Sequence, residues 1–143
     1  MPTRRIREVI EEQAILTAPG NVSVLEATQR MAEQHVGSVM ITESGRLVGI
    51  FTERDALKRV LAAGLDPTRT RLADVMTRHP QTVTPDVVLG HALHLMFEGG
   101  FRHVPVVEDG RPVGMISARD ALGPELVAFE QELHQREVIS QLL

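Results

Sequence analysis

Two short segments of the chain carry residue types suited to binding a ligand. Positions 49–55 read Gly-Ile-Phe-Thr-Glu-Arg-Asp, and positions 114–120 read Gly-Met-Ile-Ser-Ala-Arg-Asp. Each places a hydroxyl and a carboxylate three residues apart, with an arginine before the acid. A hydroxyl with a short carboxylate suits a diol such as ribose, and an arginine beside a helix N-terminus suits a phosphate. The same spacing also describes a capping box, which needs no ligand.

Other side chains support catalysis or metal binding less well. His91 and His94 share one helical face, and Glu98 follows one turn later. This spacing could hold a metal, but histidines on a solvent-facing helix surface are commoner, so we expect no metal site. The chain has no cysteine, no phosphate-binding Gly-x-x-x-x-Gly-Lys loop and a single lysine, Lys58. We therefore expect a protein that is not an enzyme.

Composition excludes several other classes of function. The 143 residues include 15 Lys plus Arg and 19 Asp plus Glu, a net charge of −4, with only 3% aromatic residues. Binding to duplex phosphates needs a basic surplus, and single strands need aromatic surfaces, so no nucleic-acid partner is expected. No apolar run approaches the roughly 20 residues of a membrane span, and the N-terminus resembles no signal peptide. We expect a cytoplasmic protein without membrane contact.

The chain contains an internal repeat that places both motifs in equivalent positions. With a shift of 65 residues, positions 27–57 match positions 92–122 at 13 of 31 sites. Further upstream, a shift of 66 residues aligns 6–10 with 72–76. We therefore assign the first copy to residues 4–64, a linker to 65–71 and the second copy to 72–123.

Each copy predicts the element order β-α-β-β-α. In the first copy a helix is expected over 24–35 after Ser23, then a hairpin turning at 43–46, then a helix from Glu53 that stops at Gly64. In the second copy the corresponding signals are a helix start at Asp86, a helix end at 99–100 and a hairpin turn at 109–110.

The predicted fold class is α/β (α+β), with the two copies packed about a pseudo-twofold axis. A unit of about 60 residues buries little surface and is only marginally stable alone, so the apolar sheets should pack against each other. Gly123-Pro124 should break the chain before a C-terminal helix within 124–143. Its apolar stripe, Leu126, Phe129 and Leu133, should cover exposed apolar surface; the alternative is contact with a partner or with a second copy.

Together these features make the chain resemble a tandem pair of cystathionine-β-synthase-type (CBS) domains. The resemblance rests on both Gly-x-x-Thr/Ser-x-x-Asp motifs, on the Phe-Arg-His-Val-Pro-Val-Val strand at 101–107 and on the repeated element order. It implies a flattened module with two clefts. In many members of the family such clefts bind adenine nucleotides or adenosyl compounds.

The resemblance also implies which residues bind the ligand. In each cleft the hydroxyl and Asp of one copy would hold the ribose, and the other copy would supply a backbone strand and basic groups. The first cleft would contain Thr52, Asp55, the backbone of Thr82 and Val83, Arg102, His103 and Arg119. The second would contain Ser117, Asp120, the backbone of Leu16 and Thr17, Gly37, Ser38 and Arg54. The first cleft has more phosphate partners and should bind a phosphorylated nucleotide more tightly.

The expected function is a non-catalytic regulatory sensor of AMP, ADP, ATP or a related adenosyl ligand, acting on a partner protein. The nucleotide would be a ligand, alone or with Mg²⁺, and no cofactor is expected. The resemblance also implies a homodimer. The alternatives are a ligand-free interaction or dimerisation module and, less favoured, a metal-dependent nucleotide hydrolase using His103 and Asp55. With an ordinary pKa near 6.5, His103 should hold phosphate less well above neutral pH.

Overall fold

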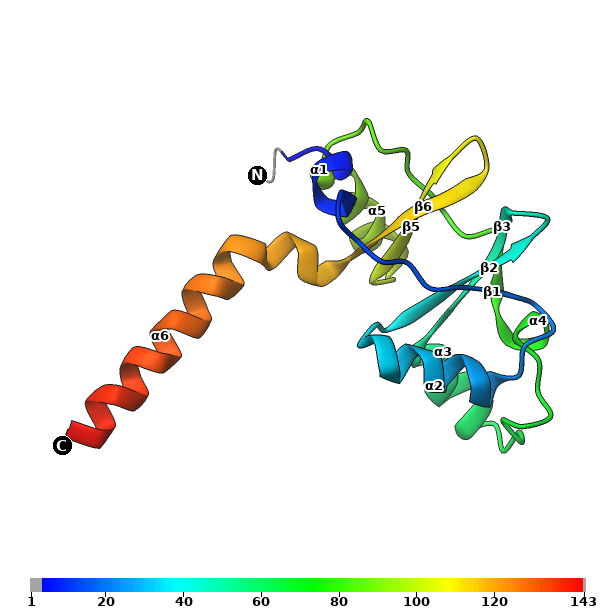
Figure 1. Cartoon of the computed structure of the whole chain (residues 1–143), viewed down its shortest axis with the longest axis horizontal. Coiled ribbons are helices and arrows are strands. Elements are labelled where there is room, and N and C mark those ends of the chain that lie inside the picture. Colours follow the sequence, from blue (N-terminus) through cyan, green and yellow to red (C-terminus); the bar gives the residue numbers. More distant parts are fainter. Residues whose placement is uncertain (1–3, 143) are drawn as a thin grey trace.

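The computed structural model describes residues 4–142, with side-chain surroundings for all of them except 121, 122, 124–130 and 142. Its helices and strands follow the predicted repeat (Figure 1). In chain order they are α1 (Ile6–Ile10), β1 (Thr17–Pro19), α2 (Val24–Gln34), β2 (Ser38–Glu43), β3 (Arg46–Thr52), α3 (Glu53–Asp55), the π-helix η1 (Ala56–Leu61), α4 (Leu72–Val75), β4 (Thr77–Arg78), α5 (Leu89–Gly99), β5 (His103–Glu108), β6 (Arg111–Ser117), the 3-10 helix η2 (Ala118–Leu122) and α6 (Gly123–Leu142).

The strands form one sheet in each half of the molecule. In the first half β1 pairs in parallel with β2, β2 and β3 form an antiparallel hairpin, and β4 adds to the edge of β3. In the second half β5 and β6 form the equivalent hairpin, and a single parallel bridge from Val83 to Val106 takes the place of β1. This arrangement confirms the predicted mixed α/β fold.

Both hairpins turn where the sequence predicts. Ser44 and Gly45 have φ of 52° and 78°, and Asp109 and Gly110 have φ of 53° and 79°. Two successive positive φ values define a type I′ turn, whose twist suits adjacent antiparallel strands. The hairpins also join the two halves, because the Leu47 N–H donates to the Gly110 carbonyl at 3.0 Å.

Each half has its own core, and each core is completed by a helix from the other sequence copy. Ile6 of α1 is fully buried in the second core, where its N–H donates to the Val87 carbonyl at 2.9 Å. Leu72 of α4 is fully buried in the first core, with its N–H bonded to the Val22 carbonyl at 2.9 Å. The sequence repeats and the packed units therefore do not coincide.

The glycine of each motif allows this exchange of helices. A Cβ on Gly49 would overlap the side chain of Met76, and a Cβ on Gly114 would lie 2.6 Å from Cγ2 of Ile10. Real Cβ contacts are longer than this. Both strands therefore need glycine so that the segment after α4, or the end of α1, can pack against them.

The second copy differs from the prediction at its first helix. Asp86 was expected to start that helix, but α5 begins at Leu89 after Val88. Asp86 instead accepts a hydrogen bond from Arg7 at 2.9 Å. The carboxylate is exposed and pairs with a residue distant in sequence, so local capping rules do not locate this helix start.

The helices after the two motifs also differ from prediction. After the first motif the expected α-helix is only one turn, α3, before it widens into η1; it still ends near Gly64, which has φ of 74°. After the second motif Gly123-Pro124 does not break the chain, because α6 starts at Gly123 directly after η2. Proline fits the first turn of a helix, where its missing N–H has no helical partner.

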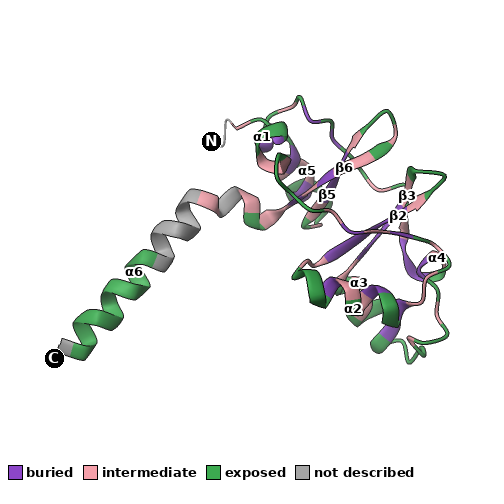
Figure 2. Cartoon of the chain, viewed as in Figure 1, coloured by how far each residue is buried: buried purple, intermediate pink, exposed green. Residues whose placement is uncertain are grey.

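Helix α6 leads away from both halves of the molecule (Figure 1). Residues 131–141 are exposed along its length (Figure 2), and Leu133 is 43% exposed. The expectation that this helix covers apolar surface of its own chain is therefore wrong for these residues, whereas Leu126 and Phe129 lie outside the described side chains. Among the helices of residues 4–142, none is long and apolar enough to cross a membrane.

Candidate functional site

The first motif lies where β3 ends and α3 begins. Thr52 has an extended backbone, and its Oγ accepts a hydrogen bond from the Asp55 N–H at 3.2 Å. In return Oδ2 of Asp55 accepts from the Thr52 N–H at 2.9 Å and from its hydroxyl at 3.1 Å. The motif thus forms a reciprocal capping box, which fixes the carboxylate and the hydroxyl side by side.

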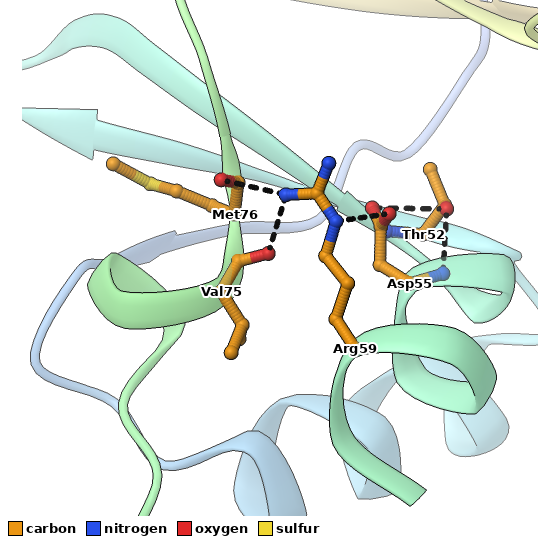
Figure 3. Close-up of polar contacts among 5 residues, drawn as sticks. All are labelled: Thr52, Asp55, Arg59, Val75 and Met76. Atoms are coloured by element: carbon orange, nitrogen blue, oxygen red, sulfur yellow. Dashed lines mark hydrogen bonds and ion pairs between the residues drawn. The ribbon is translucent and has the colours of Figure 1, made fainter. Parts of the chain in front are cut away.

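The other carboxylate oxygen of Asp55 faces Arg59 (Figure 3). Nε of Arg59 lies 3.5 Å from Oδ1 of Asp55, and its Nη1 donates to the carbonyls of Val75 and Met76 at 3.1 and 3.3 Å. Arg59 therefore connects the motif to the end of α4. Under the repeat, position 59 corresponds to Pro124, so the second copy cannot form this contact.

The second motif repeats the capping geometry without that arginine. Oδ2 of Asp120 accepts from the Ser117 N–H at 2.7 Å and from the Ser117 hydroxyl at 3.4 Å. The guanidinium of Arg4 donates to the Asp120 carbonyl at 2.7 Å, which ties the N-terminal segment to this turn.

A cleft of about 1040 Å³ opens beside the first motif. It brings together four residues predicted for it, Thr52, Asp55, Arg102 and His103. The remaining lining residues are Ile50, Glu53, Arg54, Leu57, Lys58, Arg59, Thr77, His79, Pro80, Gln81 and Phe101. The basic side chains gathered here give the cleft a surface suited to an anionic group.

A smaller cleft of about 580 Å³ lies beside the second motif. It contains five of the residues predicted for it, Leu16, Gly37, Ser38, Ser117 and Asp120. The remaining lining residues are Gln13, Ala14, Ile15, Met31, Ala32, His35, Val36, Met40, Glu53, Arg102, His103, Met115, Ala118 and Arg119.

The motif arginines lie on the opposite clefts from those predicted. Arg54 lines the first cleft and Arg119 the second, so each arginine lies with the Asp of its own copy. This placement differs from the one that the resemblance implied, in which each arginine lay in the cleft of the other copy's Asp.

The backbone strands beside the clefts are also displaced from the prediction. Thr82 and Val83 do not line the first cleft; Val83 is buried in the second core, and Pro80 and Gln81 face the cleft instead. In the second cleft Leu16 is present but Thr17 is not; Thr17 begins β1 and pairs with Met40 of β2. The 66-residue shift aligns Gln81 with Ile15, and both residues line their clefts.

Arg102 and His103 line both clefts rather than the first alone. Burial lowers the pKa of His103 from its ordinary value of 6.5, and Arg102 adds to the shift. The carboxylates of Glu53, Asp120 and Asp55 oppose it. His103 is therefore mainly neutral at pH 7 in the unliganded molecule.

The sequence analysis did not single out Lys58, Arg59 or Glu53 as cleft residues. Their positions in the sequence could have indicated this role. Glu53 directly follows the Thr52 hydroxyl, and Lys58 and Arg59 lie one helical turn after Asp55. Two of the candidate metal ligands contact each other instead of lining a cleft. Nε2 of His94 pairs with Oε1 of Glu98 at 3.0 Å on an exposed face of α5. No group of three metal-binding side chains occurs among the residues that the structure describes.

Comparison with known proteins identifies the repeat. The model of the CBS domain family matches residues 6–62 and again 72–123. The CBS domain-containing protein CBSCBSPB3 of Arabidopsis thaliana is 38% identical over 121 residues, which is 84% of this chain and 22% of the plant protein. An uncharacterised protein of Methanopyrus kandleri is 34% identical over 131 residues, 89% of this chain and 66% of that protein.

Solved structures share the whole two-copy arrangement. A CBS domain protein from Pyrobaculum aerophilum complexed with AMP has a TM-score of 0.77 and 27% identity, over 88% of this chain and 96% of that chain. A CBS domain pair in complex with 5′-methylthioadenosine and S-adenosyl-L-methionine has a TM-score of 0.77 and 27% identity, over 90% and 99%. An uncharacterised conserved protein from Pyrococcus horikoshii has a TM-score of 0.78 and 30% identity, over 87% and 94%.

Proposed function

The chain belongs to the CBS domain family, with both copies of its repeat matched, and from this premise we propose that it is a regulatory module that binds an adenine nucleotide or a related adenosyl compound. The ligand occupies the clefts beside Asp55 and Asp120. The module acts on a partner protein in the cytoplasm and does not itself catalyse a reaction.

The observation that carries this proposal is the pair of clefts, each with a hydroxyl and an aspartate fixed at a helix start. In the first cleft Thr52 and Asp55 stand beside Arg54, Lys58 and Arg102. A carboxylate accepts hydrogen bonds from both hydroxyls of a ribose, and the basic groups bind phosphate through charge-assisted hydrogen bonds. Two similar structures hold AMP, or 5′-methylthioadenosine and S-adenosyl-L-methionine, and each of these compounds contains a ribose.

Isothermal titration of AMP against the wild type, Asp55→Ala and Asp120→Ala tests the proposal. We expect Asp55→Ala to lose the tighter binding event and Asp120→Ala the weaker one, because more basic groups line the first cleft. Loss of one charge-assisted hydrogen bond weakens binding by roughly 1.5–3 kcal/mol. Asp74→Ala, an exposed acid outside both clefts, is the matched control. Equal losses in the two cleft variants contradict the ranking, and no AMP binding by the wild type contradicts nucleotide binding by this site.

A ligand-free interaction module is the second candidate, favoured by the closed capping boxes. Both oxygens of Asp55 already have partners without any ligand. Thermal-shift measurements with AMP, ADP, ATP, NAD and S-adenosylmethionine separate the two candidates, because a ligand that binds only the folded state raises Tm. No shift with any of them favours the interaction module.

We propose further that the protein is a homodimer that associates through its helical faces. Phe97 of α5 is 88% exposed, and Leu61 of η1 is 71% exposed. Size-exclusion chromatography with light scattering should show a dimer for the wild type and a monomer for Phe97→Glu. Leu133→Glu on α6 is the matched control; a monomer from this variant alone would place the contact on the C-terminal helix instead.

A further inference from the structure

The two clefts share one wall, formed by Glu53, Arg102 and His103. We propose that this wall couples the clefts negatively towards anionic ligands: a phosphate held in one cleft weakens the binding of a second phosphate in the other. Neutral nucleosides bind the two clefts independently. This inference rests on the proposed function and adds a form of regulation to the same site.

Backbone contacts hold the shared wall against both motifs. The Ala118 N–H, on the turn of the second motif, donates to the Arg102 carbonyl at 2.9 Å. The Glu53 N–H, on the turn of the first motif, donates to the Gly37 carbonyl at 2.9 Å. Each motif is therefore fixed to the residue that precedes the hairpin of its own copy, and Glu53, Arg102 and His103 line both clefts.

Gly37 leaves the space in which the charged groups of the wall meet. A Cβ at this position would lie 3.2 Å from Oε1 of Glu53 and 3.4 Å from Nε2 of His103. The Glu53 carboxylate and the His103 ring thus approach the same point from opposite copies. A group that binds there from one cleft lies next to the groups available to the other.

The wall holds one permanent cation that both clefts can reach. Arg102 carries a permanent positive charge and Glu53 a negative one, while burial keeps His103 mainly neutral at pH 7. Under the repeat, Arg102 and His103 correspond to Gly37 and Ser38, which carry no charge. The two clefts therefore share one permanent cation, Arg102, with the His103 ring beside it. A second phosphate meets the first phosphate and Glu53 with no further cation in the wall.

The other basic groups tune each cleft separately. Arg54, Lys58, Arg59 and His79 line only the first cleft, and His35 and Arg119 line only the second. They set the intrinsic affinities, so unequal affinities alone do not demonstrate coupling. The test must separate intrinsic affinity from coupling.

Isothermal titration without divalent metal makes this separation. Asp120→Ala reports the first cleft alone and Asp55→Ala the second. The coupling factor is the product of the two stepwise Kd values of the wild type divided by the product of the two single-cleft Kd values. We expect a factor of at least about fivefold for AMP, within the usual range of coupling between sites, and a factor near one for adenosine. Asp→Asn variants, which keep a cap acceptor, replace any Ala variant that fails to fold.

Arg102→Gln removes the cation that the two clefts share, and it should bring the coupling factor for AMP towards one. The matched control is Arg54→Gln, which should weaken the first cleft and leave the factor unchanged. A protein that binds two equivalents of adenosine but only one of AMP also supports the proposal. In that case the coupling is so strong that the second AMP does not bind. Equal factors for AMP and adenosine, or one equivalent of both, overturn it while leaving nucleotide binding intact. No binding of either ligand overturns the proposed function, and this inference with it.

Discussion

At the scale of single residues, the motif serves structure and ligand binding with the same atoms. Thr52 and Asp55 cap a helix with hydrogen bonds of 2.9 to 3.2 Å, and the cap fixes the carboxylate at the edge of a cleft. The capping interpretation and the binding interpretation of the sequence are therefore compatible. Preorganisation by the cap lowers the ordering cost of a ligand contact.

His103 leads to a prediction about pH. Burial lowers its pKa below 6.5, so its positive charge develops only as the pH falls below that value. A bound phosphate favours the charged form, and we expect AMP affinity relative to His103→Gln to increase as the pH falls from 8 towards 5.5. Titration at several pH values measures this; comparison with the variant removes the effect of phosphate protonation, whose pKa is about 6. An unchanged ratio across the range contradicts the role of His103.

The lowered pKa of His103 also affects the stability of the unliganded protein. Stability decreases as the pH falls, whereas AMP affinity is expected to increase. The folded state disfavours protonated His103, so the stabilisation associated with the neutral ring is complete above pH 6.5. It is lost as the pH falls through the lowered pKa. The pH that favours phosphate binding therefore weakens the unliganded fold at this position.

At the scale of elements, the motif glycines permit close packing of α1 and the segment after α4 on the central strands. We expect Gly114→Ala to destabilise the protein by about 1–3 kcal/mol, as overpacking usually does. Gly49→Ala should destabilise the protein as well, because a Cβ there would lie 3.1 Å from the Thr77 carbonyl oxygen even after the flexible Met76 side chain moves aside.

Thermal or urea unfolding measures the effect of these glycine changes. Gly123→Ala is the control, since the nearest atoms to a Cβ there belong to the Arg4 side chain, at 3.5 Å or more, and its φ is negative. Destabilisation of all three variants by the same amount would contradict the packing explanation.

At the scale of the whole molecule, the exchange of helices makes a sequence repeat a poor folding unit. Every buried residue of the first core lies between Leu16 and Met76. We therefore expect a fragment of residues 12–79 to unfold cooperatively. A fragment of equal length, residues 1–68, lacks Leu72, Val75 and Met76 and should show no cooperative transition. Circular dichroism during heating distinguishes the two, and equal behaviour would contradict the exchange.

The amino-acid sequence by itself determined the repeat, the element order, the type I′ turns at 44–45 and 109–110 and the motif residues Thr52, Asp55, Ser117 and Asp120. These features depend on hydrogen bonds and backbone angles within a few residues, so local chemistry specifies them. Only the tertiary structure decided that α1 completes the second core, that Arg54 and Arg119 stay with their own copies and that Arg102 and His103 serve both clefts. Those outcomes depend on how segments distant in the sequence pack together, and the spacing of residues along the chain carries no record of it.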